Sequence, residues 1–157
     1  ARWVLEGTDL MATVAVAEVD SRSGSVTYAN AGGPPVLHRG REEVWRYGST
    51  GPVLLGDGSG EWGEGKAVLD DGEALLLYSD GLADPTNPEG VALATVEDLC
   101  QVLERCPHLD AQRVADWCVE ESLGRAEGIP RDDATLVVVA RAIGNGTPVY
   151  PVTPAVS

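Results

Sequence analysis

Several features are missing from this 157-residue sequence, and each absence narrows what the protein can be. No apolar run approaches the ~20 residues that cross a bilayer. No basic segment followed by an apolar one opens the chain, so we expect neither membrane insertion nor secretion. Basic residues are scarce, since 11 Lys and Arg stand against 25 Asp and Glu and give a formal net charge of −14. Such a surface repels nucleic acid and attracts divalent cations, although solubility alone also explains it.

Cysteine chemistry is limited too. Cys100, Cys106 and Cys118 show no C-x-x-C spacing, and an odd number argues against a disulfide framework. We expect small buried thiols in a reducing cytoplasm and no zinc site. The chain also lacks a Gly-x-Ser-x-Gly elbow, so His38 and His108 have no serine nucleophile to activate and are expected to be packing or surface residues.

The length fits a single domain. We place this domain at residues 1–143 and expect a flexible tail at 144–157, which contains Pro and Gly and shows no periodicity.

Strand patterns dominate the first half of the chain. Alternation and valine content predict strands that pair as hairpins, with loops at 48–65 and 83–90. The predicted strands are 12–19, 26–29, 36–38, 44–47, 66–69 and 73–79, the last being the most apolar.

Two helices and one strand are predicted in the second half. Apolar residues from Val96 to Leu103 recur at helical spacing, and Asp110 is a candidate cap for the next helix. We expect Gly124 and Gly128 to close that helix, and a last strand over 134–142. Many strands, two helices and one strand favour an α+β domain with antiparallel sheet.

Two acidic motifs lie beside apolar strands. Asp80 follows the run of three leucines at 75–77, and Asp132 and Asp133 precede the last strand. A carboxylate at the end of a buried strand is costly unless a positive group meets it. Together the motifs predict a shared divalent-cation site, since Mg²⁺ and Mn²⁺ prefer oxygen ligands. An ordinary Asp-Gly turn and a polar loop entering a strand are the competing interpretations.

Six blocks, taken in order, resemble a known family. They are residues 20–24, 28–35 (Tyr-Ala-Asn-Ala-Gly-Gly-Pro-Pro), 51–56, 68–73, 77–82 (Leu-Tyr-Ser-Asp-Gly-Leu) and 132–136 (Asp-Asp-Ala-Thr-Leu). This order is similar to the later half of the stage II sporulation E phosphatases, the bacterial branch of the metal-dependent type 2C protein serine/threonine phosphatases. The resemblance spans residues 12–142.

The resemblance implies a fold and a site. The fold would be a type 2C phosphatase-like β-sandwich of antiparallel sheets with flanking helices, its N-terminal part missing here. Two Mn²⁺ or Mg²⁺ ions would lie at one edge, where a water bridging them attacks phosphorus. Asp80 and Asp132 would be metal ligands, Asp133 and Gly81 would lie beside them as supporting groups or further ligands, and no other catalytic residue is implied.

Two departures from the family are visible. The family usually has His where this chain has Gly33. The family's earlier Gly-Asp motifs, which supply bridging ligands, are not in this sequence. Residues 56–60 (Gly-Asp-Gly-Ser-Gly) imitate one of them, but lie in a predicted loop with no apolar strand before it, so we reject Asp57 as a ligand.

The expected function is hydrolysis of a phosphoprotein in bacterial signalling, for example an anti-sigma-factor antagonist, in the cytoplasm. Nucleic acid and membrane partners are not expected. This piece alone is expected to be weakly active or inactive, and to associate with the missing N-terminal half or as a homo-oligomer. The alternative is a non-catalytic phosphatase-like module that binds or regulates other proteins.

Overall fold

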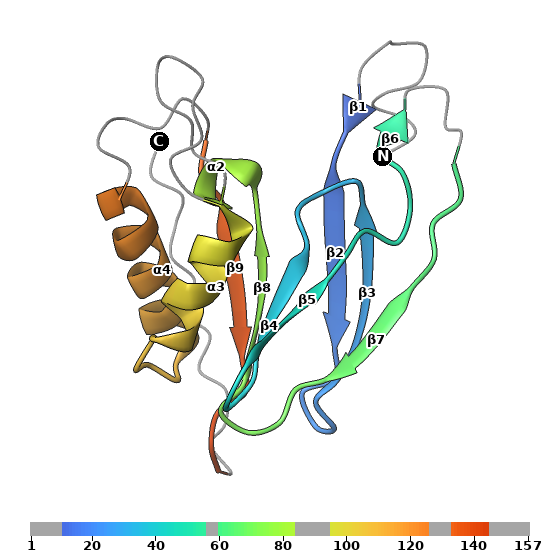
Figure 1. The fold of residues 1–157 in the computed structure, drawn as a ribbon. Helices are drawn as coiled ribbons and strands as arrows, with labels where there is room; N and C mark the ends of the chain where they lie inside the picture. Colours follow the sequence, from blue (N-terminus) through green and yellow to red (C-terminus); the bar gives the residue numbers. More distant parts are fainter. Residues whose placement is uncertain (1–10, 56–59, 84–94, 126–132, 145–157) are drawn as a thin grey trace, which may run out of the picture.

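The computed structural model describes residues 11–55, 60–83, 95–125 and 133–144 (Figure 1). Its strands form two facing antiparallel sheets, a three-stranded one in the order β2-β3-β7 and a four-stranded one in the order β5-β4-β8-β9. A short pair, β1 (Met11–Ala12) and β6 (Leu54–Leu55), lies at one end. The α+β sandwich implied by the sequence is confirmed.

The three-stranded sheet contains the first predicted hairpin. Its strands are β2 (Val14–Val19), β3 (Ser25–Ala31) and β7 (Gly65–Val68). The turn from β2 to β3 is closed by Asp20, whose backbone N–H donates to Ser25 O at 2.9 Å. Gly24 in this turn has φ +75°, and a side chain there would collide with the carbonyl oxygen of Leu69. The position therefore requires glycine.

The four-stranded sheet carries the most apolar strand at its centre. Its strands are β4 (Val36–Arg39), β5 (Val44–Tyr47), β8 (Ala74–Tyr78) and β9 (Leu136–Ala140). In β8, Leu76 packs toward the helices whereas Leu75 packs toward the other sheet. Because side chains alternate between two buried faces, β8 is an uninterrupted apolar run.

Between β8 and β9 the described residues form the helices α2 (Asp80–Ala83), α3 (Val96–Glu104) and α4 (Ala111–Arg125). Thr95 and Asp98 form a reciprocal capping box that begins α3. Asp110 accepts from the backbone N–H of Arg113 at 3.0 Å, which confirms the predicted cap of α4.

Three local predictions need correction. The helix α4 continues through Gly124 to Arg125, and Gly124 does not adopt the positive φ with which a glycine ends a helix. The four-residue helix α2 was not predicted, and β6 falls inside the predicted loop 48–65. The remaining predictions for 84–94, Gly128 and the tail from 145 lie outside the described residues.

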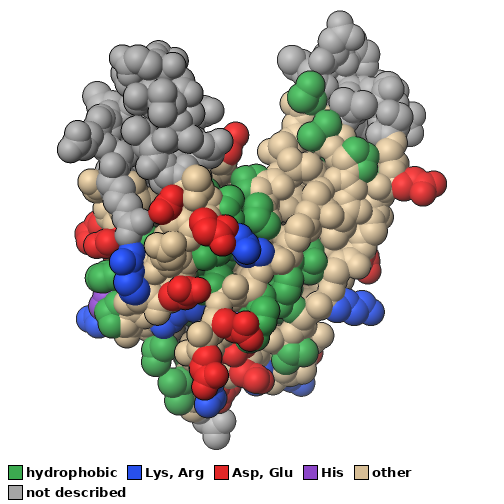
Figure 2. Space-filling model, viewed as in Figure 1, with side chains coloured by type: hydrophobic (Ala, Val, Ile, Leu, Met, Phe, Trp, Pro, Cys, Tyr) green, Lys and Arg blue, Asp and Glu red, His purple; other side chains and the backbone are tan. Residues whose placement is uncertain are grey.

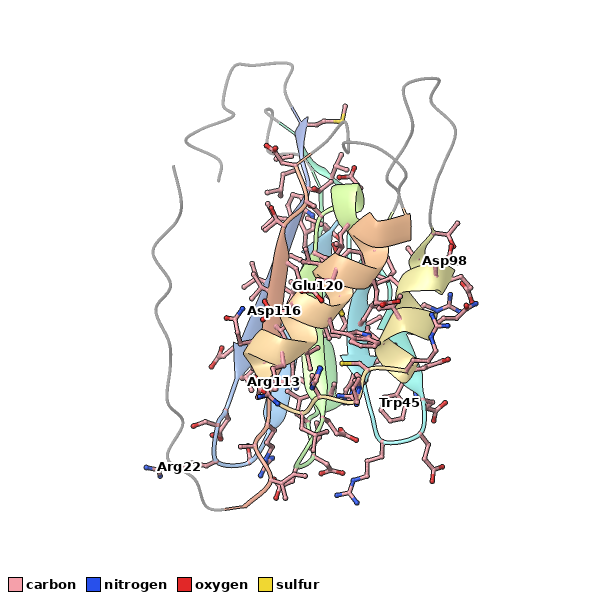
Figure 3. All side chains as sticks on the ribbon, turned by 90° about the vertical axis from the view of Figure 1, so that its left-hand side faces the viewer. Arg22, Trp45, Asp98, Arg113, Asp116 and Glu120 are labelled. Atoms are coloured by element: carbon pink, nitrogen blue, oxygen red, sulfur yellow. The ribbon has the colours of Figure 1, made fainter. Side chains whose placement is uncertain are left out.

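Two apolar clusters hold the layers together. One fills the space between the four-stranded sheet and the helices α3 and α4, which lie across its outer face (Figure 3). The other lies between the two sheets and is built on Val26, Val36, Leu69 and Leu75. The helices thus cover one outer face of the sandwich, and no described helix covers the other (Figure 1).

The three cysteines belong to the helix layer. All three are buried and free, as expected from their spacing. Burial raises the pKa of the Cys118 thiol to about 12 and also raises that of Cys100. No helix among the described residues is long and apolar enough to cross a membrane.

Candidate metal centre

The two acidic motifs meet where β8 ends and β9 begins. Tyr78 is the register partner of Leu136, so the residues just beyond this pair lie side by side. Ser79 N–H donates to Thr135 O at 3.0 Å, and Thr135 N–H donates back to Ser79 Oγ at 2.8 Å. The Ser79 hydroxyl in turn donates to Asp133 O at 2.9 Å. These bonds hold the Asp80 segment against the Asp133 segment.

Asp80 occupies the first position of α2 and is exposed. Its Oδ1 accepts from the backbone N–H of Gly81 at 3.0 Å. Leu82 and Ala83 are 1% and 2% exposed and anchor the short helix in the core. Because this side of α2 is buried, the carboxylate of Asp80 lies on the surface, just beyond the end of β8.

Only some of the predicted metal-site residues belong to the described ranges. Asp80 and Asp133 are present as exposed carboxylates on neighbouring segments, and Gly81 is buried beside them. Asp132 lies outside the described residues, so its position stays a prediction.

The donor chemistry suits a hard divalent cation, because carboxylate oxygens are the preferred ligands of Mg²⁺ and Mn²⁺. Within the described ranges, no three His, Cys, Asp or Glu residues converge as a possible metal-binding group. Asp80 is the predicted metal ligand that these ranges place at the end of β8.

At the end of β3, the fully buried Asn30 closes the following loop, since its Oδ1 accepts from Gly33 N–H at 3.0 Å and its Nδ2 donates to Pro34 O at 2.7 Å. A Cβ at Gly33 would lie 3.0 Å from the Asn30 amide oxygen. Any side chain at this position would require the Asn30 amide to shift by a few tenths of an ångström. The sequence analysis missed the role of Asn30.

A second buried network was also missed. His38 and Glu73 are 3% and 7% exposed, and His38 Nε2 lies 2.8 Å from Glu73 Oε2. The other ring nitrogen, Nδ1, lies 2.8 Å from the hydroxyl of Tyr47. Of the two roles expected for His38, on the surface or packed in a strand, the structure shows the second, and its carboxylate partner was not foreseen. A signal existed, because Glu73 is a charged residue directly before the most apolar strand.

Comparison with known proteins identifies the family. The sequence profile of "Stage II sporulation protein E (SpoIIE)" matches residues 4–142. The chain belongs to the SpoIIE family. This confirms the resemblance carried by the six sequence blocks, and the fold is that of type 2C phosphatase domains.

Individual relatives agree with this assignment. Protein IcfG from Synechocystis is 28% identical over 135 residues, which cover 84% of this chain and 21% of that protein. The manganese-soaked phosphatase domain of SpoIIE from Bacillus subtilis has a TM-score of 0.68 at 19% identity, over 87% of this chain and 59% of that domain. The RsbU and RsbW domains of a Mycobacterium tuberculosis protein give 0.67 at 26%, over 83% and 36%. The chain thus spans about a fifth of Protein IcfG and little more than half of the solved SpoIIE domain.

Proposed function

We propose that this chain is part of a Mn²⁺- or Mg²⁺-dependent phosphatase that hydrolyses phosphoserine or phosphothreonine in a protein. One observation carries the proposal. In a member of the SpoIIE family, hydrogen bonds through Ser79 hold the strand end that bears Asp80 against the segment that bears Asp133. Such an arrangement brings carboxylates from separate parts of the chain to one lip of the sandwich.

In this proposal Asp80 and Asp132 bind the metal, with Asp133 and Gly81 beside them. Two bound divalent ions supply positive charge to the phosphoryl oxygens and make water a better nucleophile. The chain itself contributes placement. Buried Leu82 and Ala83 fix the start of α2 so that Asp80 stays exposed, and the Ser79 hydroxyl fixes the backbone next to it.

The substrate class follows from the family. We propose a phosphorylated bacterial signalling protein such as an anti-sigma-factor antagonist, met in the cytoplasm. The three free, buried cysteines suit a reducing compartment. The net charge of −14 is unfavourable for a nucleic acid partner, and acidic side chains are spread over the face shown in Figure 2.

Phosphate release from a phosphoserine protein tests the proposal, with the longest polypeptide the gene encodes and with this chain alone. We expect activity of the long form that requires Mn²⁺ or Mg²⁺ and falls at least ~100-fold in Asp80→Asn, since removing a metal ligand removes charge from the reacting centre. Asp116→Asn is the matched control, because Asp116 is exposed on α4 (Figure 3). Equal activity of Asp80→Asn and the unchanged protein would refute the assignment.

A non-catalytic, protein-binding role is the second candidate, and one observation favours it. The described residues do not bring three metal-binding side chains together. Calorimetry with Mn²⁺ separates the candidates, since micromolar binding that is lost in Asp80→Asn favours the phosphatase. A long form that binds no Mn²⁺ and releases no phosphate favours the binding module.

We also propose that the three-stranded sheet binds further polypeptide, either another segment of a longer chain or a second copy. Its outer face carries Val14, Val16 and Val68, which are 36%, 58% and 57% exposed. Val14 and Val16 are neighbours on this face, and the row of Glu18, Thr27 and Lys66 separates them from Val68. Neighbouring exposed aliphatic side chains are found at surfaces that contact a partner. Sedimentation of this chain and of the long form tests this, and a monomeric chain that stays soluble and gains no partner in the long form speaks against it.

A further inference from the structure

The hydrophobic pattern of β8 does not determine its register. A one-residue slip of a strand normally moves apolar side chains to a polar face, and this penalty fixes the register. In β8, however, Leu75, Leu76 and Leu77 are consecutive and both faces are apolar. A slip would exchange leucines between the two clusters, although it would also displace Ala74 and Tyr78 from the cluster that faces the helices. The neighbouring strand β9 is equally uniform, with three consecutive valines at 137–139.

Polar contacts at the two ends of β8 do distinguish one register from another. At the Ala74 end of β8, Glu73 Oε2 lies 2.8 Å from His38 Nε2 and accepts a hydrogen bond from the backbone N–H of Asp70 at 3.0 Å. The Tyr47 hydroxyl lies 2.8 Å from the other ring nitrogen of His38, Nδ1. A slip of one residue would turn the Glu73 side chain to the opposite face. It would leave a buried carboxylate and a buried imidazole without their partners, which is strongly unfavourable.

At the Tyr78 end of β8, the hydroxyl of Ser79 distinguishes one register from another relative to β9. It accepts from Thr135 N–H at 2.8 Å and donates to Asp133 O at 2.9 Å, so both of its hydrogen-bonding roles are satisfied only in the observed register. The pair of contacts lies one residue before Asp80. A slip would move Asp80 along the strand by about 3.3 Å relative to Asp133. Metal ligands tolerate deviations of only about 0.2 Å.

We propose that the His38–Glu73 pair and the Ser79 hydroxyl set the register of β8, and that they are positioning residues for Asp80. The link to Asp80 as a ligand rests on the proposed metal-dependent function, whereas the register itself does not. The two contacts act at opposite ends of a five-residue strand and on different neighbours, β4 and β9. Either contact alone is sufficient to hold the strand.

Disulfide trapping across β8 and β9 tests the register directly. Leu77 is the register partner of Val137, so Leu77→Cys with Val137→Cys should form a bridge. Leu77→Cys with Leu136→Cys or with Val138→Cys should not, because these side chains point to the opposite face. In His38→Phe/Glu73→Leu/Ser79→Ala, which replaces the buried pair by apolar groups, we expect the two slipped bridges to increase at least ten-fold. The variants that lack only one contact should form the native bridge alone.

A control triple variant removes a hydroxyl and an ion pair away from β8. Ser23→Ala loses a turn hydroxyl that donates to Asp20, and Arg46→Met/Glu97→Leu loses the ion pair between β5 and α3. This control should form only the native bridge. If the β8 triple variant folds, as judged by circular dichroism, and still forms only the native bridge, the register proposal is wrong.

The Mn²⁺ affinity of the long form, measured with the same substitutions but without the added cysteines, is a separate test. We expect at least ten-fold weaker binding in the β8 triple variant and no change in the control. Slipped bridges together with unchanged Mn²⁺ affinity would overturn the positioning role while leaving the register role intact. Absence of Mn²⁺ binding in the unchanged long form would instead count against the proposed function.

Discussion

The two sheets of this sandwich differ in how many of their faces are buried. The four-stranded sheet is buried on both faces, with Leu76 fully buried under the helices and Leu75 fully buried against the other sheet. The three-stranded sheet is buried on one face only, and its outer face exposes Val16 and Val68. Apolar residues occupy the outer faces of both sheets. Sequence hydrophobicity therefore indicates which faces can be buried, whereas the described helices cover only the outer face of the four-stranded sheet.

The strongest test of this difference compares two truncations. Leu76→Ala should lower the free energy of unfolding by about 2–5 kcal/mol, since it opens a cavity in the covered layer. Val16→Ala should change it by less than about 1 kcal/mol, because Val16 is 58% exposed. Urea unfolding measures both. Equal losses would mean that the outer face around Val16 is covered in solution.

Two glycines with positive φ allow the turns of the two sheets to be compared by substitution. Gly24→Ala, in the three-stranded sheet, should cost more than about 2 kcal/mol, since the added methyl would strike the Leu69 carbonyl as well as strain the backbone. Gly72→Ala, in the turn before β8, should cost only about 1 kcal/mol. An added methyl there meets the exposed side chain of Ile143 at 3.3 Å. Thermal unfolding of both variants ranks them, and the reverse order would show that the β2–β3 turn is not the rigid one.

Two tyrosines compare hydrogen bonding in the two apolar clusters, since Tyr78 lies in the cluster under the helices and Tyr47 packs against the cluster between the sheets. Tyr78 lies under the helices with a buried hydroxyl that has no hydrogen-bond partner among the described residues, and burial raises its pKa. Tyr78→Phe should therefore stabilise the fold by about 1 kcal/mol. Tyr47→Phe, which removes the contact to His38, should destabilise it by about the same amount. A loss of stability in Tyr78→Phe would show that its hydroxyl has acquired a partner, such as a buried water.

The smallest effect concerns acid. Hydrogen bonds from the backbone of Arg22 and the hydroxyl of Ser23 lower the pKa of Asp20 in the first hairpin. A carboxyl with a lowered pKa in the folded state stabilises it above the unfolded pKa, and this contribution is lost as pH falls through the folded value. Asp20→Asn should therefore be slightly less stable than the unchanged protein at pH 7, and the difference should shrink as the pH falls below the ordinary Asp pKa. A difference that does not change with pH would contradict the assignment to the ionised carboxylate.

Much of the fold was predictable because its signals are local. The hairpin of β2 and β3 is indicated by alternation on both sides of a polar turn, and α3 by apolar residues at helical spacing. The helix α2 was missed since four residues show no periodicity. The end of α4 was misplaced because Gly124 suggested a stop, whereas its backbone stays helical.

The site was predictable only in part. Sequence analysis singled out Asp80 by its position after a buried strand, and the structure places it exposed at that strand's end. The contacts of Ser79 with Thr135 and of His38 with Glu73 depend on how strands pair. Pairing joins residues far apart in the chain, so these contacts could not be seen from the sequence. The place of Asp132 stays a prediction.

The strand β2 has a practical consequence for handling the protein. It lies at the edge of its sheet, with its outer valines in contact with solvent. Its sequence, Val-Ala-Val-Ala-Glu-Val, has high β-propensity, no proline and a single charge. Such edges can pair with identical strands of other molecules and seed fibrils. Glu18 is the gatekeeper of this segment, and mutual repulsion from the net charge of −14 is the second safeguard. High salt screens that repulsion, so concentrated stocks should be kept at low ionic strength.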